Sequence, residues 1–263
     1  MINNIMQNCE LVSIITPSYN CAKFVEETIQ SILSQTYTNW ELLFQDDCST
    51  DNTKEIVAKY AEKDSRIKYE CNARNSGAAI TRNNALRRAK GKWIAFLDSD
   101  DLWLPEKLEK QIEFMKSNNY YFSYTRYCEI NEQSEEIGRA ISGPKCITKI
   151  GMFSFCWPGC LTVMYDCEHI GLIQIADIKK NNDYAMWLKV AQKSSCYLLD
   201  ECLAKYRRGR VGSISTHSYI TLIKWHYKLF RQSEEMNPIS SLFLTCINLI
   251  CGIYKKKKYV KHY

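Results

Sequence analysis

The chain has 263 residues, 46% of them hydrophobic, and a formal net charge of +6. This length can bury one large core with an extension, and the charge is too small to indicate a nucleic-acid partner. The 13 cysteines are odd in number, scattered and without a C-x-x-C pair, which excludes a small disulfide scaffold and predicts reduced, mostly buried thiols. The N-terminal MINNIMQNCE lacks the charged and apolar regions of a secretory signal, so a cytoplasmic protein is expected.

Strands and helices alternate through the first part of the chain. We expect strands at 11–16, 40–45, 67–70 and 93–97, with helices at 21–35, 51–63 and 79–89. Such alternation predicts right-handed βαβ units and a parallel sheet. The residues that follow the first, second and fourth strands would then meet at one rim, which brings Tyr19, Asp47 and Asp98 together.

The segment WIAFLDSDDLWLP, residues 93–105, leads an apolar strand into the carboxylates Asp98, Asp100 and Asp101. Close carboxylates repel one another unless a cation offsets their charge, so the cluster favours a divalent metal that carries phosphate. The other interpretation is a solvated loop that caps the next helix. Neither G-x-G-x-x-G nor G-x-x-x-x-G-K-[ST] occurs, so a bound diphosphate would have to be neutralised by metal and arginine, and Asp100 and Arg82 suit those tasks.

Four ordered blocks together resemble the nucleotide-site motifs of the family 2 glycosyltransferases. The blocks are VSIITPSYN, SILSQTYTNWELLFQDDCSTDNT, NSGAAITRNNAL and GKWIAFLDSDDLWLP, and they extend over residues 10–110. The resemblance implies an inverting enzyme of the GT-A fold. This is an α/β architecture with a Rossmann-like, mostly parallel sheet flanked by helices, here followed by a C-terminal helical extension.

The resemblance also assigns the part of the rim that binds uracil. It implies that Pro17 and Tyr19 lie against the base and that Asp47 accepts a hydrogen bond from it. Cys48 departs from the family, which commonly has glycine after the two acids. The choice between Asp46 and Asp47 therefore depends on the geometry of this turn.

Other residues are assigned by the resemblance to the phosphates, the sugar and the metal. Asn75 and Arg82 would line the base or the phosphate side, and Asp98 would lie near the ribose or the donor sugar. Asp100 would bind the Mn²⁺ or Mg²⁺ that bridges the diphosphate. Asp101 is expected to be structural at the entry of the next helix.

The second half of the chain is expected to form the acceptor side. We predict a helix at 105–118, a strand at 120–130, a variable excursion at 131–155 and a strand at 161–165. The segment NDYAMWL, residues 182–188, resembles the acidic motif of the family, and this resemblance makes Asp183 the catalytic base. An aspartate that opens a helix is also a common N-cap, and Asn182 stands where the family usually has another acid.

Two short strands at 196–199 and 203–207 precede an arginine- and glycine-rich segment at 207–215. This segment is either a loop that closes over the diphosphate or a solvated basic turn. His217 is either an additional metal ligand, as in some GT-A enzymes, or a structural residue before the next helix.

In the last part of the chain we expect helices at 219–235 and 239–254, followed by the basic stretch KKKKYVK. The apolar run at 239–254 is shorter than the ~20 residues of a bilayer span and meets lysines, which favours attachment to the surface of an anionic inner membrane. The other interpretation is a helix packed on the catalytic domain or on a partner chain. We therefore expect a GT-A domain at 1–217, with a nucleotide half at 1–110 and an acceptor half at 111–217, and amphipathic helices with a basic tail at 218–263.

The predicted function is a metal-dependent, inverting transfer of a hexose or N-acetylhexosamine from a UDP-sugar to a hydroxyl of a saccharide acceptor. By resemblance, the acceptor is a polyprenyl-linked saccharide in surface polysaccharide biosynthesis, used at the cytoplasmic face of the inner membrane. Two alternatives are a catalytically silent nucleotide-sugar-binding protein, which would lose the base, and a sugar nucleotidyltransferase. The latter should carry a glycine-rich basic loop after the first strand, and PSYNCAKF is no such loop.

Overall fold

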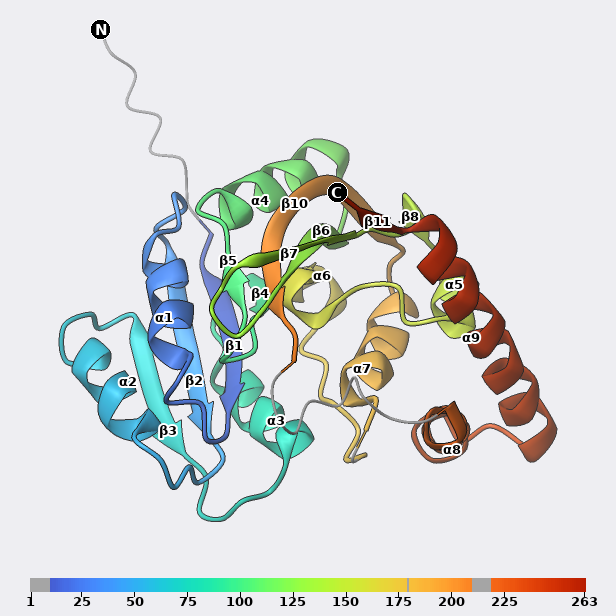
Figure 1. Ribbon diagram of the computed structural model, residues 1–263, viewed down its shortest axis with the longest axis horizontal. Helices are drawn as coiled ribbons and strands as arrows, with labels where there is room; N and C mark the ends of the chain where they lie inside the picture. The colour runs from blue at the N-terminus through green and yellow to red at the C-terminus, as the bar shows by residue number, and fades with distance from the viewer. Residues whose placement is uncertain (1–9, 179, 210–218) are drawn as a thin grey trace, which may run out of the picture.

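The computed structural model describes residues 10–178, 180–209 and 219–263. Within these ranges one mixed sheet forms the centre of the molecule, with strands in the order β11-β7-β6-β9-β4-β1-β2-β3 (Figure 1). Strand β10 pairs with β6 and with the short strands β5 and β8. Helices lie on both faces of the sheet, so the predicted α/β architecture is confirmed.

The first half of the chain builds the parallel part of this sheet. Its elements are β1 (Val12–Ser18), α1 (Val25–Leu33), β2 (Trp40–Asp46), α2 (Thr53–Ala61), β3 (Ile67–Cys71), α3 (Ala78–Arg88) and β4 (Trp93–Phe96). β1 pairs in parallel with β2 and β4, and β2 pairs in parallel with β3. Every residue of β1 and β2 is buried, as expected for strands that helices cover on both faces.

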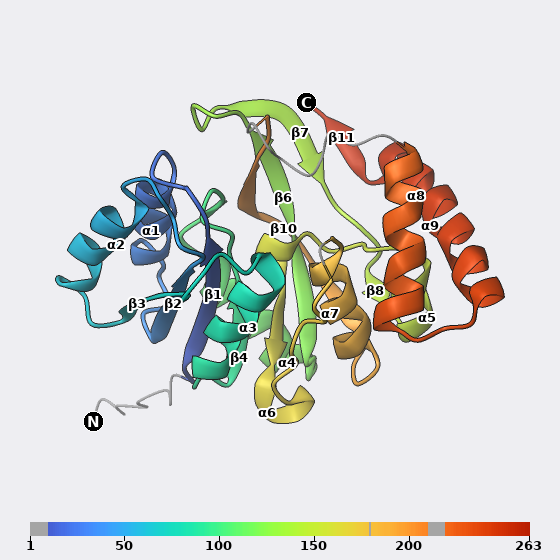
Figure 2. The same cartoon turned by 90° about the horizontal axis from the view of Figure 1, so that it is seen from below.

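Neighbouring residues of a strand pack on opposite faces of this sheet. Ile14 belongs to the apolar cluster that includes Ile29 of α1, whereas Ile15 belongs to the cluster that includes Leu86 of α3. Helix α1 therefore covers one face and α3 the other, because side chains alternate along a strand. Figure 2 shows α3 in front of β1 and β4.

The second half is mainly antiparallel. Its elements are β5 (Leu102–Trp103), α4 (Lys107–Asn118), β6 (Phe122–Ile130), β7 (Glu136–Ile141), β8 (Cys146–Ile147), α5 (Lys149–Ser154), the 3₁₀ turn η1 (Cys160–Thr162), β9 (Met164–Asp166), α6 (Cys167–Ile170), α7 (Asn182–Ala191) and β10 (Cys196–Arg207). β9 pairs antiparallel with β4 and β6, and β7 pairs antiparallel with β6. β10 runs parallel to β6, so parallel pairing extends beyond the first half at this one pair of strands in the described chain.

Two details of this half differ from the sequence predictions. The two short strands expected at 196–199 and 203–207 form one strand, β10, because register shifts around Cys202 absorb the polar residues between them. The excursion expected at 131–155 contains β7, β8 and α5, so it is mostly regular structure.

Helix α7 is anchored by aromatic packing. The ring of Trp187 lies 5.1 Å from that of Phe96 in β4 and 6.1 Å from that of Phe122 in β6, measured between centroids. These contacts fix α7 against the middle of the sheet. Its first turn, which contains Asp183, lies close enough to Asp98 for the two charges to interact.

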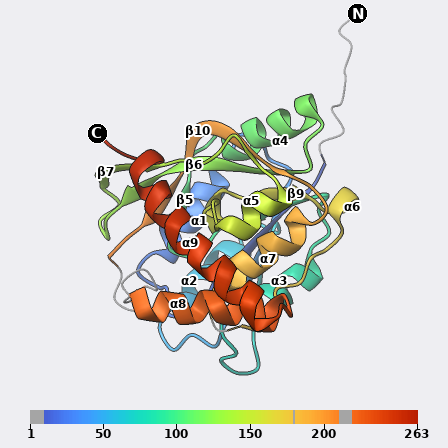
Figure 3. The ribbon, with the colours of Figure 1, turned by 90° about the vertical axis from the view of Figure 1, so that its right-hand side faces the viewer.

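The chain ends in α8 (Tyr219–Lys228), a short π-helical stretch η3 (Leu229–Ser233), α9 (Pro238–Lys258) and β11 (Val260–His262). Figure 3 shows α9 running across the outside of the molecule in front of α5. With 21 residues, α9 is longer than the predicted 239–254, and its length and composition would allow it to cross a membrane. The residues beyond the predicted range are Pro238 and the four lysines at 255–258, so the apolar run itself has the predicted extent. β11 pairs with β7, so the basic tail ends as an edge strand of the sheet.

Helix α9 is polar on its inner side and apolar on its outer side. Its buried residues are Ser241, Thr245 and Asn248, whereas its exposed residues include Ile239, Leu242, Phe243, Ile250 and Ile253. A surface helix of a water-soluble domain normally shows the opposite pattern. The protein side of α9 is held by hydrogen bonds, among them Asn248 Nδ2 to the carbonyl of Phe153 at 3.1 Å, and by partly buried Leu244 and Cys251, which pack against the core.

One of the four lysines at the end of α9, Lys255, is turned toward the protein. Lys255 Nζ donates to the carbonyl of Trp157 at 2.7 Å, and burial lowers the pKa of Lys255 to about 8. Lys256 and Lys257 are exposed. The basic end of α9 therefore presents fewer cations to a surface than the sequence suggests.

Candidate active site

The carboxyl ends of β1, β2 and β4 meet at one rim. Ser18 and Asp46 are register partners at the ends of β1 and β2, and β4 pairs in parallel on the other side of β1. Tyr19, Asp47 and Asp98 follow these strand ends in the sequence. The predicted convergence of the three strand ends is thus confirmed.

Asp47 is buried and holds the loop that enters α3. Its Oδ1 accepts hydrogen bonds from Asn72 Nδ2 and from the backbone N of Ser76, each at 2.7 Å, and its Oδ2 accepts one from the backbone N of Gly77 at 2.7 Å. Gly77 has a φ of +85°, a conformation that favours glycine. Oδ1 already accepts two hydrogen bonds, but Oδ2 has a second lone pair that could accept one from a ligand, and the contact with uracil stays a prediction.

The turn after Asp47 explains the departure at Cys48. Cys48 has a φ of +60°, in the left-handed region where glycine is at ease. The cysteine therefore keeps the turn that a glycine would make. Asp46 is used within this turn, because its two oxygens accept hydrogen bonds from Ser49 Oγ at 2.5 Å and Tyr69 Oη at 2.9 Å. Asp46 and Asp47 each accept three hydrogen bonds within the protein, so the assignment of Asp47 rather than Asp46 to uracil stays a prediction.

The other residues assigned to uracil binding differ in how far they are exposed to solvent. Pro17 is buried near the end of β1, Tyr19 is 45% exposed, and Asn75 is exposed in the loop between β3 and α3. An aromatic side chain that is exposed to solvent can stack on a nucleobase of any kind, because every base has a π-face. Tyr19 has the exposure that such stacking needs, while Asn75 makes no side-chain hydrogen bond or ion pair with the described residues, and its role stays a prediction.

Arg82 connects the two halves of the molecule. It projects from α3, is buried, forms an ion pair with Asp98 after β4, and donates from Nη1 to Asn182 Oδ1 of α7 at 2.7 Å. One guanidinium thus joins the acidic strand end to the helix that carries Asp183. Asn182 supplies the acceptor at the position where the family usually has an acid, so the departure there still leaves Arg82 with a partner.

Asp183 is half-buried in the first turn of α7. Burial raises the pKa of Asp183, the charge of Arg82 offsets part of this rise, and Asp98 adds to it. The N-cap position belongs to Asn181, which has a φ of +58°, so the interpretation of Asp183 as an N-cap is wrong. A carboxylate whose pKa is raised toward neutrality is suited to accept a proton.

Arg207 of β10 fixes the acids that follow Asp98. Its backbone N donates to Asp101 Oδ1 at 2.9 Å, its Nε donates to the carbonyl of Asp100 at 2.8 Å, and its Nη2 pairs with Glu27 at 2.8 Å. Burial and the neighbouring charges of Asp100 and Asp98 raise the pKa of Asp101 well above its usual range. Asp101 is structural, as predicted, but it contacts β10 rather than the start of a helix.

The residues at the rim fit a divalent cation that arrives with its substrate. Asp98 is paired with Arg82 and Asp101 with β10, while Asp100 is half-buried between them. No group of three or more His, Cys, Asp or Glu side chains in the described ranges could hold a metal by itself. Mg²⁺ in nucleotide sites is typically held by one or two carboxylates together with substrate phosphates and water. Asp100 could supply that protein ligand.

The arginine-rich segment is only partly described. Arg207 contacts Asp100, Asp101 and Glu27, and Arg208 Nη1 donates to Glu129 at 3.1 Å. These two arginines therefore have structural partners rather than open positions over a diphosphate. The rest of the segment, 210–215, and His217 lie outside the described residues.

Sequence reasoning missed several residues at the rim. Asn72 donates to Asp47 and to Thr81 Oγ1 and accepts from Gln45 and Asn84, so it is the centre of the network that holds the Asp47 loop. The only signal for Asn72 in the sequence is its place as the first residue after β3.

Cys160 was also missed. Its thiol lies close enough to Arg82, Asp98 and Asp183 to interact with their charges, and burial raises its pKa well above the usual range. Nothing in the sequence distinguishes Cys160 from the other cysteines. Its position becomes visible only when η1 is packed beside β4.

Comparison with known proteins agrees with this geometry. The family model described as Glycosyl transferase family 2 matches residues 13–163. The chain is 41% identical over 228 residues to Bacillus subtilis (strain 168) TuaG, a protein named for glycosyl transfer in teichuronic acid biosynthesis, with 86% of this chain and 90% of TuaG covered. It is 39% identical over 248 residues to Escherichia coli WfgD, named as a UDP-Glc:alpha-D-GlcNAc-diphosphoundecaprenol beta-1,3-glucosyltransferase, with 93% and 94% covered.

A solved structure gives the same architecture. S. aureus TarS 1-349 in complex with UDP-GlcNAc matches with a TM-score of 0.71 at 20% identity, and the match covers 91% of this chain and 71% of that chain. At this identity the likeness shows the fold alone. The GT-A architecture expected from the sequence is therefore confirmed.

Proposed function

The chain belongs to glycosyl transferase family 2 and is a glycosyltransferase, and we propose that it transfers a hexose or N-acetylhexosamine from a UDP-sugar to a polyprenyl-linked saccharide with inversion at the anomeric carbon. One observation carries the mechanism. Arg82 holds Asp98, at the donor side, next to the helix that presents Asp183. An acid for the donor and a base for the acceptor are thereby brought to one place.

The donor is bound at the rim of the parallel sheet. Tyr19 and Pro17 lie against the uracil, and Asp47 accepts a hydrogen bond from the uracil. Asp98 contacts the ribose or the sugar, and Arg82 faces the phosphate side. These assignments are supported by the position of Tyr19, Asp47 and Asp98 after the ends of three neighbouring strands of the sheet.

A Mn²⁺ or Mg²⁺ ion held by Asp100 would neutralise charge on the departing diphosphate. Arg207 contributes indirectly, because it fixes the backbone of Asp100 and the carboxylate of Asp101. The rigid support of β10 keeps the Asp100 carboxylate at the rim.

Asp183 acts as the general base of the transfer. It removes the proton of the attacking acceptor hydroxyl while the oxygen forms a bond with the anomeric carbon and the bond to the UDP oxygen breaks. Attack from the face opposite the leaving group inverts the anomeric centre. The raised pKa of Asp183 supports this role, because a base with a pKa nearer to working pH accepts a proton more effectively.

The acceptor is a saccharide on polyprenyl diphosphate for surface polysaccharide, used at the cytoplasmic face of the inner membrane. Support comes from the names of the relatives TuaG and WfgD and from α9, whose outer side is apolar and whose end carries exposed Lys256 and Lys257. Such a helix can lie in the interface of an anionic membrane with its apolar side in the lipid.

The test is UDP release from a panel of UDP-sugars, with Mn²⁺ or EDTA and with or without N-acetylglucosaminyl diphosphopolyprenol. We expect one UDP-sugar to give release that needs both metal and acceptor, and a β-linked product from the α-linked donor by NMR. Binding of a UDP-sugar without acceptor-dependent release would support the silent binding protein instead. An α-linked product would contradict inversion.

A further inference from the structure

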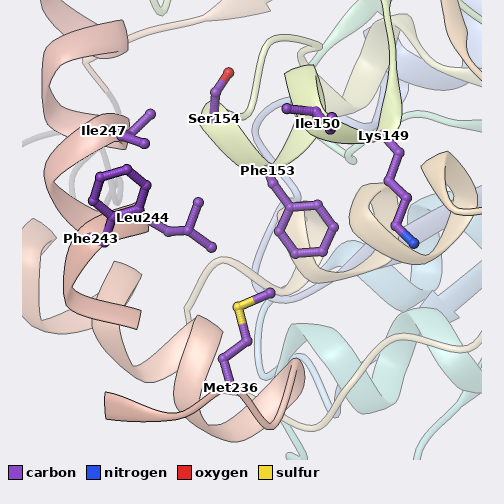
Figure 4. A pocket seen from close by; sticks show the side chains of 8 residues that line it. All are labelled: Lys149, Ile150, Phe153, Ser154, Met236, Phe243, Leu244 and Ile247. Atoms are coloured by element: carbon purple, nitrogen blue, oxygen red, sulfur yellow. The ribbon is translucent and has the colours of Figure 1, made fainter. Parts of the chain in front are cut away.

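An apolar groove lies between α5 and α9, away from the nucleotide rim. The α5–α9 groove has a volume of about 320 Å³. It is lined by Lys149, Ile150, Phe153, Ser154, Met236, Phe243, Leu244 and Ile247. Figure 4 shows the side chains of the two helices facing each other across this space, with Met236 closing one side and Lys149 at an end. A recess of this shape fits a flexible hydrocarbon chain.

The walls of the groove are fixed to the catalytic helix. The carbonyl of Phe153 accepts hydrogen bonds from Tyr184 Oη at 3.2 Å and from Asn248 Nδ2 at 3.1 Å. Tyr184 follows Asp183 in α7, so α5, α9 and the proposed base are held by one network. A chain bound in the α5–α9 groove would therefore lie on the acceptor half, beside the helix that presents the base.

Charge at the groove is suited to an amphiphile with an anionic end. Lys149 is exposed on the α5 side of the groove, beyond Phe153, and no ion-pair partner is found for it among the described residues (Figure 4). The remaining wall is apolar apart from Ser154. An apolar slot with one cation beside it matches an isoprenoid chain joined to a diphosphate.

We propose that the α5–α9 groove binds the first isoprene units of the acceptor, with Lys149 near its diphosphate. This inference rests on the proposed polyprenyl-linked acceptor and adds a subsite to it. The groove is too small for a whole polyprenyl chain, so the remainder stays in the bilayer against the outer side of α9. The enzyme would thus recognise its lipid acceptor by chain as well as by sugar.

A matched pair of substitutions separates the groove from membrane attachment. Phe243 and Ile250 are 65% and 66% exposed and lie two helical turns apart on the same side of α9, but only Phe243 lines the groove. Phe243→Asp and Ile250→Asp should weaken binding to anionic vesicles to a similar extent. Because both side chains are exposed, neither variant should unfold the protein, and the melting temperature checks this.

The probe is farnesyl diphosphate, with the nucleotide site filled by UDP and Mn²⁺. Losing the contact of one aromatic ring should weaken its binding to Phe243→Asp by roughly tenfold, whereas Ile250→Asp should bind it like the unmodified chain. Inorganic diphosphate should compete poorly. In the transfer assay, Phe243→Asp should raise the KM for the polyprenyl acceptor and leave the KM for a short-chain analogue unchanged.

Equal affinity of the two variants for farnesyl diphosphate would overturn the groove assignment, even with transfer intact. Dimerisation that depends on Phe243 and excludes the probe would overturn it in favour of a second copy of the chain. Absence of transfer to any polyprenyl acceptor would overturn the proposed function and the acceptor assignment together.

Discussion

The proposed nucleotide half, 1–110, and the proposed acceptor half, 111–217, place their candidate site residues in different ways. In the nucleotide half, Tyr19, Asp47 and Asp98 follow the ends of three strands that are neighbours in the sheet, so the topology of the parallel sheet alone brings them to one rim. In the acceptor half, Asp183 reaches that rim on a helix that is held by Trp187 and by the contact between Arg82 and Asn182. Topology thus determines the proposed donor site, whereas a few side-chain contacts determine the position of the proposed base. Single substitutions should therefore separate the two functions.

The largest effect is expected at the donor side. Asp100→Ala removes the carboxylate proposed to meet the metal, so Mn²⁺-dependent binding of UDP should disappear in calorimetry. Glu106→Ala is the control, since Glu106 is an exposed acid that pairs with Lys110 on the surface. Retention of Mn²⁺-dependent UDP binding in Asp100→Ala would contradict the metal assignment.

Breaking the bridge between the halves should have the next largest effect. Arg82→Met removes the ion pair with Asp98 and the hydrogen bond to Asn182, and a displaced base should lower kcat/KM by about a hundredfold. Arg87→Met is the control on the same helix, because Arg87 bonds only Asn84 among the described contacts. Equal activity of the two variants would show that α7 needs no bridge.

A substitution in the network around Asp47 should reduce activity less than the loss of Arg82. Asn72→Leu removes the centre of the network around Asp47 and should lower the free energy of unfolding by about 1–3 kcal/mol. Two backbone donors still hold Asp47, so UDP affinity should fall by less than about tenfold while kcat stays close to that of the unmodified enzyme. Denaturant melts and UDP titration measure the two quantities. A large fall in kcat would show that the donor loop also positions the base.

The smallest effect is expected at Asn182. In Asn182→Asp, the new carboxylate should pair with Arg82 and weaken the influence of Arg82 on Asp183, which raises the pKa of Asp183 further. Since the base must be deprotonated, activity is lost as pH falls through this pKa. The acidic limb of the kcat profile should therefore move to higher pH, with the maximal kcat within about threefold. A limb that moves to lower pH would contradict the proposed coupling.

The same comparison explains which parts were predictable from the sequence. Apolar runs that end in polar residues identify parallel strands and their loops, so the rim around Asp98 could be predicted. Asn72 and Cys160 could not, because their importance comes from neighbours distant in the sequence. The inverted polarity of α9 was hidden as well, since an apolar run does not reveal which of its sides faces the protein.

The most direct measurement compares turnover and UDP binding in Asp183→Asn, which keeps the shape of the side chain and removes its basicity. We predict that kcat for sugar transfer falls by about 10²–10⁴-fold, while UDP binds with unchanged affinity. A variant with near-normal kcat would contradict the assignment of Asp183 as the base. Loss of UDP binding together with turnover would contradict the separation of donor site and base.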